Sequence, residues 1–514
     1  MRKFYTLLVV AMTAIAARAT DYKVPVTVIV NGVTSEQTGD FTVVENDGLY
    51  DITLKNFILQ SEDGPMGVGN VELKGIVPYK DGDATLLVAT DEVKITDGDD
   101  PNVPVWMAGM LPPVPVELRG KIVGDQLRCY LDINLMESLG QMIQVAIGSG
   151  YQLPNPSFEA WHASTEEYVE PNGWHSFESA TGDLALAAGH HVEKSKDVHS
   201  GAASARIFST SIFGIIANGT MTTGRMNAGA MSAIDPANNA YLDMSKTDVD
   251  GNGDPFYVPL CSRPDSVALW VKFKQGTPNS EHPYATVSAV ITDGTYYQDP
   301  EDKDYTNVVA KAKDNKIAAT DGKWVRISAP FDYTKNAVDP KAVLVTVSTN
   351  ADAGQGSGED ELFVDDIAFI YNAKVTSLKI KGQDVPGFSP DKMTYEMELN
   401  EVIKAEDIEV TVEGKCPHVV KDVQAMGDYY LCAVYAIGGD MSTVSVYAVS
   451  VKSSAAGIRN LQSATNQPAT YFTLDGRQTK TLVPGRIYIR RQADGKSIQL
   501  LYDYNHQIIK KNIY

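Results

Sequence analysis

Oxygen-bearing side chains recur at every second position in one loop of this chain, which contains Asp248, Asp250, Asn252 and Asp254. Hard oxygen ligands at this spacing are typical of Ca²⁺-binding loops, and the intervening glycines let the backbone wrap around an ion. An EF-hand requires a glutamate at the last loop position, where this chain has Pro259, so a helix-loop-helix site is excluded. The remaining interpretations are a loose Ca²⁺ loop and a solvated acidic turn.

Two adjacent tyrosines, Tyr296 and Tyr297, follow a Thr-Asp-Gly turn signal and precede an acidic run, so we expect them on an exposed loop. An aromatic face can stack on the C–H side of a sugar ring while neighbouring polar groups bind its hydroxyls. These tyrosines are the predicted platform for a carbohydrate, and Trp161 is the second candidate. Trp174 and Trp324 lie inside strand-like patterns and are predicted to belong to the core.

Five of the eight histidines fall within one stretch of the chain, namely His162, His175, His190, His191 and His199. Neutral imidazoles gathered in this way can bind Zn²⁺ or Cu²⁺. Neighbours in a strand point to opposite faces, however, so His190 and His191 cannot serve one site without a bulge. The pattern favours ordinary structural histidines over a shared metal site.

Catalytic signatures are absent from the sequence. It contains no Gly-x-Ser-x-Gly elbow, His-Glu-x-x-His helix, phosphate-binding glycine loop or Cys-x-x-Cys pair. Glycoside hydrolysis needs two carboxylates on either side of the scissile bond, and position alone cannot nominate a pair among 65 acidic residues. No catalytic residue is assigned, and the sequence favours a binding function over an enzyme.

The N-terminus predicts export. Residues 1–19 begin with two basic side chains, continue through an apolar run and end at Ala17-Arg18-Ala19, which is typical of a secretory signal peptide too short to remain as a membrane span. This segment carries three basic and no acidic side chains, so its removal lowers the net charge from −21 to −24. Such a surface repels nucleic acid and anionic lipid. No cysteine follows the cleavage site, so we expect a surface, extracellular or periplasmic protein that is not a lipoprotein.

Four cysteines are too few to form a disulfide scaffold in a chain of 514 residues. Cys129 alternates with apolar residues and is predicted to be a buried hydrophobe. Cys416 and Cys432 are close enough in sequence to pair in an oxidising compartment, and both the paired and the free state remain open.

Nearly every patterned segment alternates with period two, which predicts an all-β protein of several domains. Residues 20–148 read as an antiparallel meander, with turn signals between alternating strands. Motifs at residues 50–57, 68–73 and 118–121 resemble the calycin-like, lipocalin-like domain of bacterial secreted proteins. This resemblance implies a β-barrel that is either filled by its own side chains or holds an apolar ligand.

Two short motifs bracket the next region, residues 150–372: Asn155-Pro156-Ser157-Phe158-Glu159-Ala160-Trp161 and Leu362-Phe363-Val364-Asp365-Asp366-Ile367. Together with the motifs between them, they resemble the carbohydrate metabolism domain of bacterial cell-envelope proteins, a galactose-binding-like jelly roll. The resemblance implies that the opening and closing strands lie side by side. It also implies a structural Ca²⁺ held by Glu159 and Asp365, the alternative being that both are merely exposed at strand ends.

The remaining sequence predicts two smaller β elements. Residues 373–452 alternate again and resemble an immunoglobulin-like or cadherin-like sandwich, a type that usually acts as a spacer. Residues 453–514 comprise a linker and a segment around Tyr471-Phe472-Thr473-Leu474-Asp475-Gly476-Arg477 that resembles the C-terminal sorting signal of type IX secretion. A plain terminal β-hairpin is the alternative for this segment.

These patterns together predict an exported all-β protein with a calycin-like barrel, a jelly-roll sandwich, an immunoglobulin-like sandwich and a small β tail. The predicted function is noncatalytic carbohydrate binding by the central jelly roll, with structural Ca²⁺ as the expected ion and the secretion machinery as a second partner. A glycoside hydrolase and a structural adhesin are the alternatives. A cleft lined by aromatic side chains would favour binding, whereas two facing carboxylates at its base would favour hydrolysis.

Overall fold

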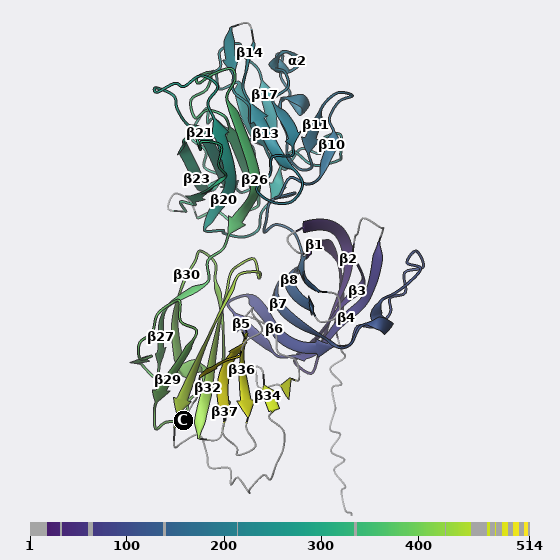
Figure 1. The fold of residues 1–514 in the computed structure, drawn as a ribbon, viewed down its shortest axis with the longest axis vertical. Coiled ribbons are helices and arrows are strands. Elements are labelled where there is room, and N and C mark those ends of the chain that lie inside the picture. Colours follow the sequence, from purple (N-terminus) through teal and green to yellow (C-terminus); the bar gives the residue numbers. More distant parts are fainter. Residues whose placement is uncertain are drawn as a thin grey trace, which may run out of the picture.

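The computed structural model describes residues 18–30, 33–59, 65–136, 140–212, 214–333, 337–426 and 428–453, and five strands between residues 470 and 511. Most of the predicted signal peptide, almost all of the linker and much of the predicted sorting segment lie outside the described residues. Within the described part the chain is nearly all β, which confirms the predicted fold class (Figure 1). No described helix is long and apolar enough to span a membrane.

The N-terminal sheet contains nine antiparallel strands: β1 (Arg18–Val30), β2 (Val33–Asn46), β3 (Leu49–Leu59), β4 (Met66–Ile76), β5 (Pro78–Asp81), β6 (Ala84–Val93), β7 (Val114–Val123), β8 (Gln126–Leu135) and β9 (Gln141–Ile147). They follow the order β4-β3-β2-β1-β9-β8-β7-β6-β5 and curl into a half-barrel (Figure 1). The predicted alternation is visible in the burial: Val26 and Val28 are each 1% exposed, and Cys129 is fully buried. Membership of the calycins stays a prediction.

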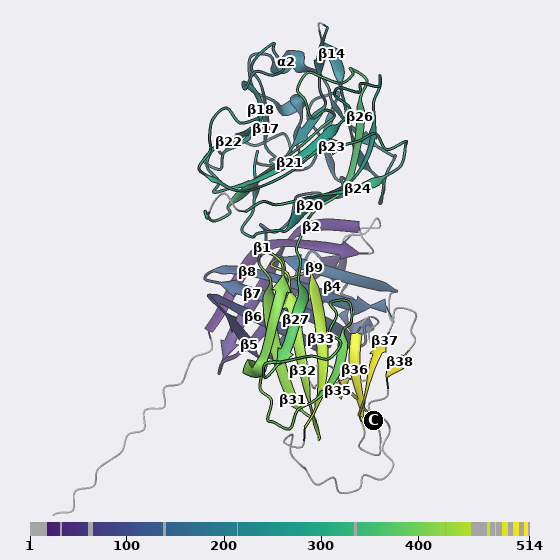
Figure 2. The same ribbon diagram turned by 90° about the vertical axis from the view of Figure 1, so that its left-hand side faces the viewer.

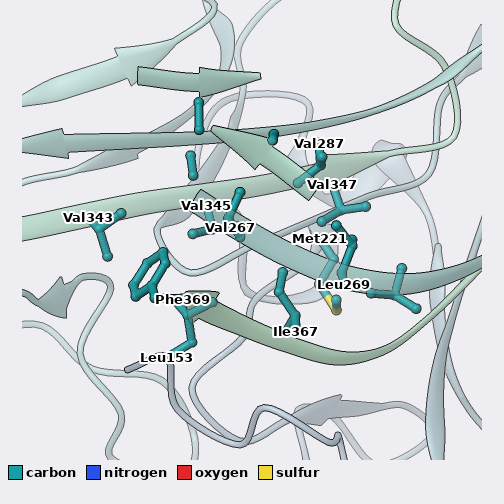
Figure 3. Packing of buried hydrophobic residues seen from close by; sticks show 14 of the residues in the cluster. Leu153, Met221, Val267, Leu269, Val287, Val343, Val345, Val347, Ile367 and Phe369 are labelled. Carbon is teal, nitrogen blue, oxygen red and sulfur yellow. The ribbon is translucent and has the colours of Figure 1, made fainter. Parts of the chain in front are cut away.

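The central sandwich is built from two larger sheets. One contains β12 (Val192–Ser195), β13 (Ser204–Phe208), β26 (Glu361–Ile370), β20 (Ser266–Lys274) and β24 (Val325–Pro330), in that order. The other contains β16 (Thr220–Thr222), β25 (Ala342–Ser348), β21 (Ala285–Thr292) and β23 (Val308–Ile317), and β19 (Val258–Pro259) pairs with β25. Their facing sides form a dry core in which Val267, Val287, Val345 and Ile367 interdigitate (Figure 3).

Smaller elements surround this sandwich. They are the hairpins β10 (Trp161–Ala163) with β11 (Val169–Pro171) and β14 (Thr210–Ile212) with β15 (Ile215–Ala217), the sheet of β17 (Arg225–Ala228), β18 (Asn238–Leu242) and β22 (Tyr297–Asp299), and the short helices η2 (Phe177–Ser179) and α2 (Ala185–Ala188). Helix α2 and the β14–β15 hairpin lie at the end of the sandwich farthest from the rest of the molecule (Figures 1 and 2).

The two bracketing motifs lie side by side, as predicted. The N–H of Ile367 donates to the carbonyl of Pro156 at 2.9 Å. Phe158 is fully buried and its ring lies 5.4 Å from that of Trp174, which is also fully buried. The prediction that Trp174 belongs to the core is therefore confirmed, whereas Trp324 is only half-buried.

The third sandwich consists of seven strands: β27 (Lys374–Ile380), β28 (Gln383–Asp384), β29 (Thr394–Glu398), β30 (Ile408–Glu413), β31 (His418–Ala425), β32 (Tyr429–Ile437) and β33 (Val444–Lys452). One sheet has the order β28-β27-β30 and the other the order β29-β33-β32-β31, in which β29 runs parallel to β33. The 3-10 helix η3 (Ala405–Asp407) precedes β30, and η1 (Ala108–Met110) precedes β7 in the N-terminal sheet. Cys416 and Cys432 are both free.

The chain ends in a five-stranded antiparallel sheet of β34 (Thr470–Phe472), β35 (Gln478–Thr479), β36 (Arg486–Arg491), β37 (Ser497–Tyr502) and β38 (Ile508–Lys511). Its order is β35-β34-β36-β37-β38. This part of the chain therefore contains more strands than a single terminal hairpin would.

The N-terminal sheet packs against the third sandwich, although the central sandwich separates them in sequence (Figure 1). Arg128 donates from Nε to the carbonyl of Asp440 at 2.9 Å, and Arg119 donates from Nε to the carbonyl of Met441 at 2.8 Å. Beside these contacts lies a shared apolar cluster that includes Leu86 from β6. The turn between β32 and β33 is thereby held on the outer surface of the N-terminal sheet.

Candidate functional site

A groove of about 310 Å³ lies at the far end of the central sandwich, beside α2 and the β14–β15 hairpin. Small-molecule sites in proteins usually enclose about 300–1,000 Å³, so the groove has room for a small ligand. Its floor is the outer face of the β16-β25-β21-β23 sheet, and its walls come from shorter elements above that sheet.

The floor of the groove consists mainly of hydroxyl side chains, with Lys313 of β23 opposite Ser288. Thr286 and Ser288 of β21 face the groove because they alternate with residues such as Val287, which point into the core. Strand register places Ser348 opposite Thr286 and Thr346 opposite Ser288 on the neighbouring strand β25. The sheet therefore presents cross-strand rows of hydroxyl groups to whatever occupies the groove.

The walls of the groove are mainly apolar. They are formed by α2, by the β14–β15 hairpin and by the segment around β17 and β18, and their lining side chains include Leu184, Ile212, Ile216, Met226 and Met231. The single aromatic lining residue among those described is Phe177, and the single carboxylate is that of Asp299. Neither an aromatic-rich cleft nor a pair of facing carboxylates is present in the described lining.

Most amide side chains around the groove are already occupied in shaping its loops. Asn238, for example, accepts the N–H groups of Gly229 and Ala230, each at 3.0 Å. Asn239 differs, because its Nδ2 donates to the carbonyl of Pro236 at 2.8 Å while its buried Oδ1 has no hydrogen-bond partner. A buried acceptor without a donor costs about 1–3 kcal/mol, so this oxygen is an unfavourable feature of the fold beside the groove.

The two predicted platform tyrosines lie outside this lining. Tyr296 is 39% exposed and its hydroxyl donates to Oε1 of Gln298 at 2.8 Å. Tyr297 is 2% exposed and packs in a small core cluster with Leu242, and burial raises its pKa. The expectation that both rings are exposed is therefore wrong for Tyr297, because β22 turns it inward while its neighbour faces solvent. A role in sugar binding remains a prediction for Tyr296 alone.

Trp161 is half-buried and belongs to the framework of the central sandwich. Its ring packs against the main core, and its Nε1 donates to the carbonyl of Phe158 at 2.5 Å. Both contacts stabilise the turn that follows the opening motif. Sugar binding by Trp161 is untested, but the ring already has a packing role that accounts for its position.

Glu159 and Asp365 come together on one turn, residues 199–203. Oε1 of Glu159 accepts the N–H of Ala202 at 2.8 Å, and Oδ2 of Asp365 accepts the N–H groups of His199 at 2.8 Å and Ser200 at 3.2 Å. The turn requires a glycine at position 201, where φ is 68° and a Cβ atom would lie 1.9 Å from Oε1 of Glu159. Through these hydrogen bonds both carboxylates hold the turn in place. A Ca²⁺ ion between them stays a prediction.

Asp365 should make the stability of the protein depend on pH. Its side chain is fully buried, and burial raises its pKa from 3.8 to about 6. The folded state thus holds this proton more tightly than the unfolded state, so the stabilisation is complete below about pH 3.8 and is lost as the pH rises through about 6. As the pH rises from 4 to 7, the difference in unfolding free energy between Asp365→Asn and the wild type should move in favour of the variant by up to about 3 kcal/mol. Urea denaturation at a series of pH values measures this difference, and parallel pH profiles would contradict it.

The predicted Ca²⁺ loop splits between two roles. Asp248 forms an ion pair with Arg225 at the protein surface. Asp250 turns inward, and its Oδ1 accepts the N–H groups of Asn252 at 2.9 Å and Asp254 at 2.8 Å. The four side chains therefore do not converge on a single ion.

Sequence reasoning missed the groove residues, although one signal was present. The alternation of hydroxyl and aliphatic residues in β21 places a polar face opposite a core face. An outward hydroxyl face is also what an ordinary solvated sheet presents. The walls that turn this face into a groove come from segments remote in sequence, and no local pattern reveals them.

No protein-family model matches the chain, and no curated protein matches it. Among solved structures, the chain aligns with the M60 catalytic domain with the CBM51-1 and CBM51-2 domains of ZmpB from Clostridium perfringens. The TM-score is 0.14 and the identity 11%, and the alignment covers 96% of this chain and 44% of the other. The chain thus spans less than half of that neighbour, and a likeness at this TM-score carries no argument about fold or function.

Proposed function

We propose that this protein binds a carbohydrate, without cleaving it, in the groove at the far end of the central sandwich. The observation that carries this proposal is the combination of cross-strand rows of hydroxyl groups on the floor of the groove with apolar side chains on its walls. A sugar offers many hydroxyl groups that can donate and accept hydrogen bonds at such a surface. Its C–H faces can at the same time lie against apolar walls.

The groove supports binding better than hydrolysis. A glycosidase places two carboxyl groups on either side of the scissile bond, about 5–10 Å apart. Among the described lining residues only Asp299 carries a carboxylate. The remaining polar groups are hydroxyls, amides and the ammonium group of Lys313, which can orient a sugar but do not form the pair of carboxyl groups that a glycosidase uses.

The elements that wall the groove, α2 and the β14–β15 hairpin, lie far from the N-terminal sheet and the third sandwich, which suits a binding module presented to the outside (Figure 2). The proposal includes export through the predicted signal peptide and display at the cell surface, with the C-terminal segment as the sorting element. Cell fractionation with an antibody against the full chain tests this part, and a wholly cytoplasmic protein would exclude it.

Filling the groove should abolish glycan binding. Ala187 lies on α2, is exposed and lines the groove, so Ala187→Trp places a large ring in the ligand volume without disturbing the core. A glycan array identifies the ligand, and we expect its affinity to fall at least about tenfold in this variant, which is 1.4 kcal/mol. The matched control is Leu186→Trp on the same helix, because Leu186 is fully exposed and lies outside the lining.

Two further variants locate the binding surface. Ser288→Ala removes a hydroxyl from the groove floor, and Tyr296→Ala removes the exposed tyrosine outside it. We expect the glycan affinity to fall in Ser288→Ala and to stay unchanged in Tyr296→Ala. Loss of binding only in Tyr296→Ala would move the site to that loop, whereas an array without hits would favour an adhesin that recognises protein.

A further inference from the structure

Two histidines and an aspartate from separate segments meet in a buried cluster of the central sandwich. His162 belongs to β10, His175 precedes η2, and Asp250 lies on the loop between β18 and β19. Nε2 of His162 lies 3.4 Å from Oδ2 of Asp250, and Nε2 of His175 lies 3.2 Å from the same oxygen. The side chains of His162, His175 and Asp250 are 9%, 0% and 1% exposed.

The polar atoms at the centre of this cluster lack hydrogen-bond partners. Nε2 of His162, both ring nitrogens of His175 and Oδ2 of Asp250 are buried and unsatisfied within the described part of the chain. Buried polar side-chain atoms are normally paired, and each unpaired group costs about 1–3 kcal/mol. Several such atoms gathered around Oδ2 of Asp250 therefore indicate that a partner is missing at this place.

The neighbourhood of His162 indicates the charge of that partner. Nδ1 of His162 lies 3.2 Å from Oδ1 of Asn172, and an amide oxygen can only accept a hydrogen bond. Nδ1 therefore carries the proton, which leaves a lone pair on Nε2 when the ring is neutral. This lone pair faces the carboxylate oxygen of Asp250, so a cation between them would convert repulsion into coordination.

The distances fit a metal ion held by three side chains, those of His162, Asp250 and Asp254. Zinc–ligand bonds of about 2.0–2.2 Å in a tetrahedron separate neighbouring ligand atoms by about 3.3–3.6 Å. The observed separations from Oδ2 of Asp250 are 3.4 Å to His162 and 3.2 Å to His175. Asp254 offers a further carboxylate oxygen, because its ligand atom and those of His162 and Asp250 all lie within 4.8 Å of one another.

Backbone contacts hold the two carboxylates in place, as the outer partners of a metal site do. Oδ1 of Asp250 is occupied by the N–H groups of Asn252 and Asp254, which leaves Oδ2 directed at the histidines. Oδ2 of Asp254 accepts the N–H of Gly173 at 2.8 Å, which ties the acidic loop to the segment between the two histidines.

We propose that His162, Asp250 and Asp254 form a structural site for a transition-metal ion of the Zn²⁺ type, and that His175 lies beside the ion against Oδ2 of Asp250. Imidazole nitrogens select Zn²⁺, Cu²⁺ or Ni²⁺, whereas Ca²⁺ takes six to eight oxygen ligands. The ion crosslinks β10 and the acidic loop. This role is independent of glycan binding, because none of the four residues lines the groove.

The other three histidines of the same stretch have different partners. His190 stacks on Tyr168, both ring nitrogens of His191 face backbone carbonyl groups, and His199 stacks on Trp270. The site thus uses one of the five clustered histidines as a ligand and completes its ligand set from the acidic loop.

Metal analysis of the full chain tests this proposal. After chelation with EDTA and reloading with zinc alone, we expect about one zinc ion per chain, and a melting temperature about 5 °C or more higher when zinc exceeds its Kd a hundredfold. Calcium should produce neither effect. Zinc that neither binds nor shifts the melting temperature would overturn the site, and so would a shift produced by calcium alone, which would assign the loop to a hard cation.

His162→Gln should reduce bound zinc to near none. The matched control is His282→Gln, because His282 also pairs with an aspartate, its Nδ1 lying 2.7 Å from Oδ2 of Asp352, but with only that one carboxylate. Equal zinc retention in both variants would overturn the proposal. Asn172→Ala serves if His162→Gln fails to fold: Asn172 only positions His162, so zinc affinity should fall about 10–100-fold while the protein stays folded. Unchanged affinity in that variant would contradict the assigned role of Nε2.

Discussion

Replacing Trp174 with alanine is expected to lower the free energy of unfolding of the central sandwich by about 3–5 kcal/mol. Trp174 is fully buried, packs against Phe158 and donates from Nε1 to the carbonyl of Pro154 at 3.0 Å. Its removal leaves a large cavity and an unpaired carbonyl on Pro154, directly before the opening motif. Because that motif also hydrogen-bonds to β26, the join between the two ends of the sandwich should loosen as well.

Differential scanning calorimetry of the full chain measures this effect as a fall in the transition temperature of the central sandwich. Trp324→Ala is the control, because Trp324 is a tryptophan of the same sandwich that is only half-buried and whose Nε1 has no hydrogen-bond partner. It should cost clearly less, since less apolar area leaves the protein interior. Equal losses in the two variants would contradict the packing described for Trp174.

Replacing Arg128 with methionine is expected to cost about 2–4 kcal/mol and to separate the unfolding of the N-terminal sheet from that of the third sandwich. Arg128 is 5% exposed, donates to the carbonyls of Asp440 at 2.9 Å and Gly148 at 2.8 Å, and lies over the ring of Tyr151. Methionine retains the apolar stem but leaves both buried carbonyls without a donor.

Calorimetry combined with limited proteolysis follows this second effect. In the wild type the two parts should melt together, and in Arg128→Met the turn between β32 and β33 should become cleavable before the N-terminal sheet unfolds. Arg326→Met is the control, because Arg326 is exposed on β24 and its loss should stay within about 0.5 kcal/mol. A single unchanged transition in Arg128→Met would show that the two parts are held together by other contacts.

Residue patterns predicted the positions of individual strands better than they predicted which side chains are exposed. The alternation around Val26 and Val28 correctly placed both in the core, and the same reasoning placed Cys129 there. Tyr297 was predicted to be exposed together with Tyr296, and it is buried. A turn signal locates a loop but does not tell which of two adjacent side chains the next strand turns inward, because that depends on the sheet it joins.

The acidic loop shows that spacing in the sequence also does not tell which side chains come together as possible metal ligands. Asp250 and Asp254 were grouped with Asp248 by spacing, yet Asp248 binds Arg225 and the other two face His162 and the segment beside it. The sequence pattern favoured ordinary structural histidines over a shared metal site, and His190 and His191 do have separate partners, although neither lies in a strand. His162 and His175 converge because β10, β11 and the following turn fold back on each other.

The sequence by itself determined the all-β class, because period-two alternation and turn chemistry are local properties of the chain. The resemblance of the two bracketing motifs to a known domain implied that Pro156 and Ile367 lie side by side. The sequence could also show that Trp174 is buried. Only the tertiary structure decided which polar groups meet: the hydroxyl rows of β21 and β25, the two carboxylates on the turn at Gly201, and the histidines around Asp250. These arrangements depend on contacts between segments far apart in sequence, and such contacts are set by the packing of whole sheets.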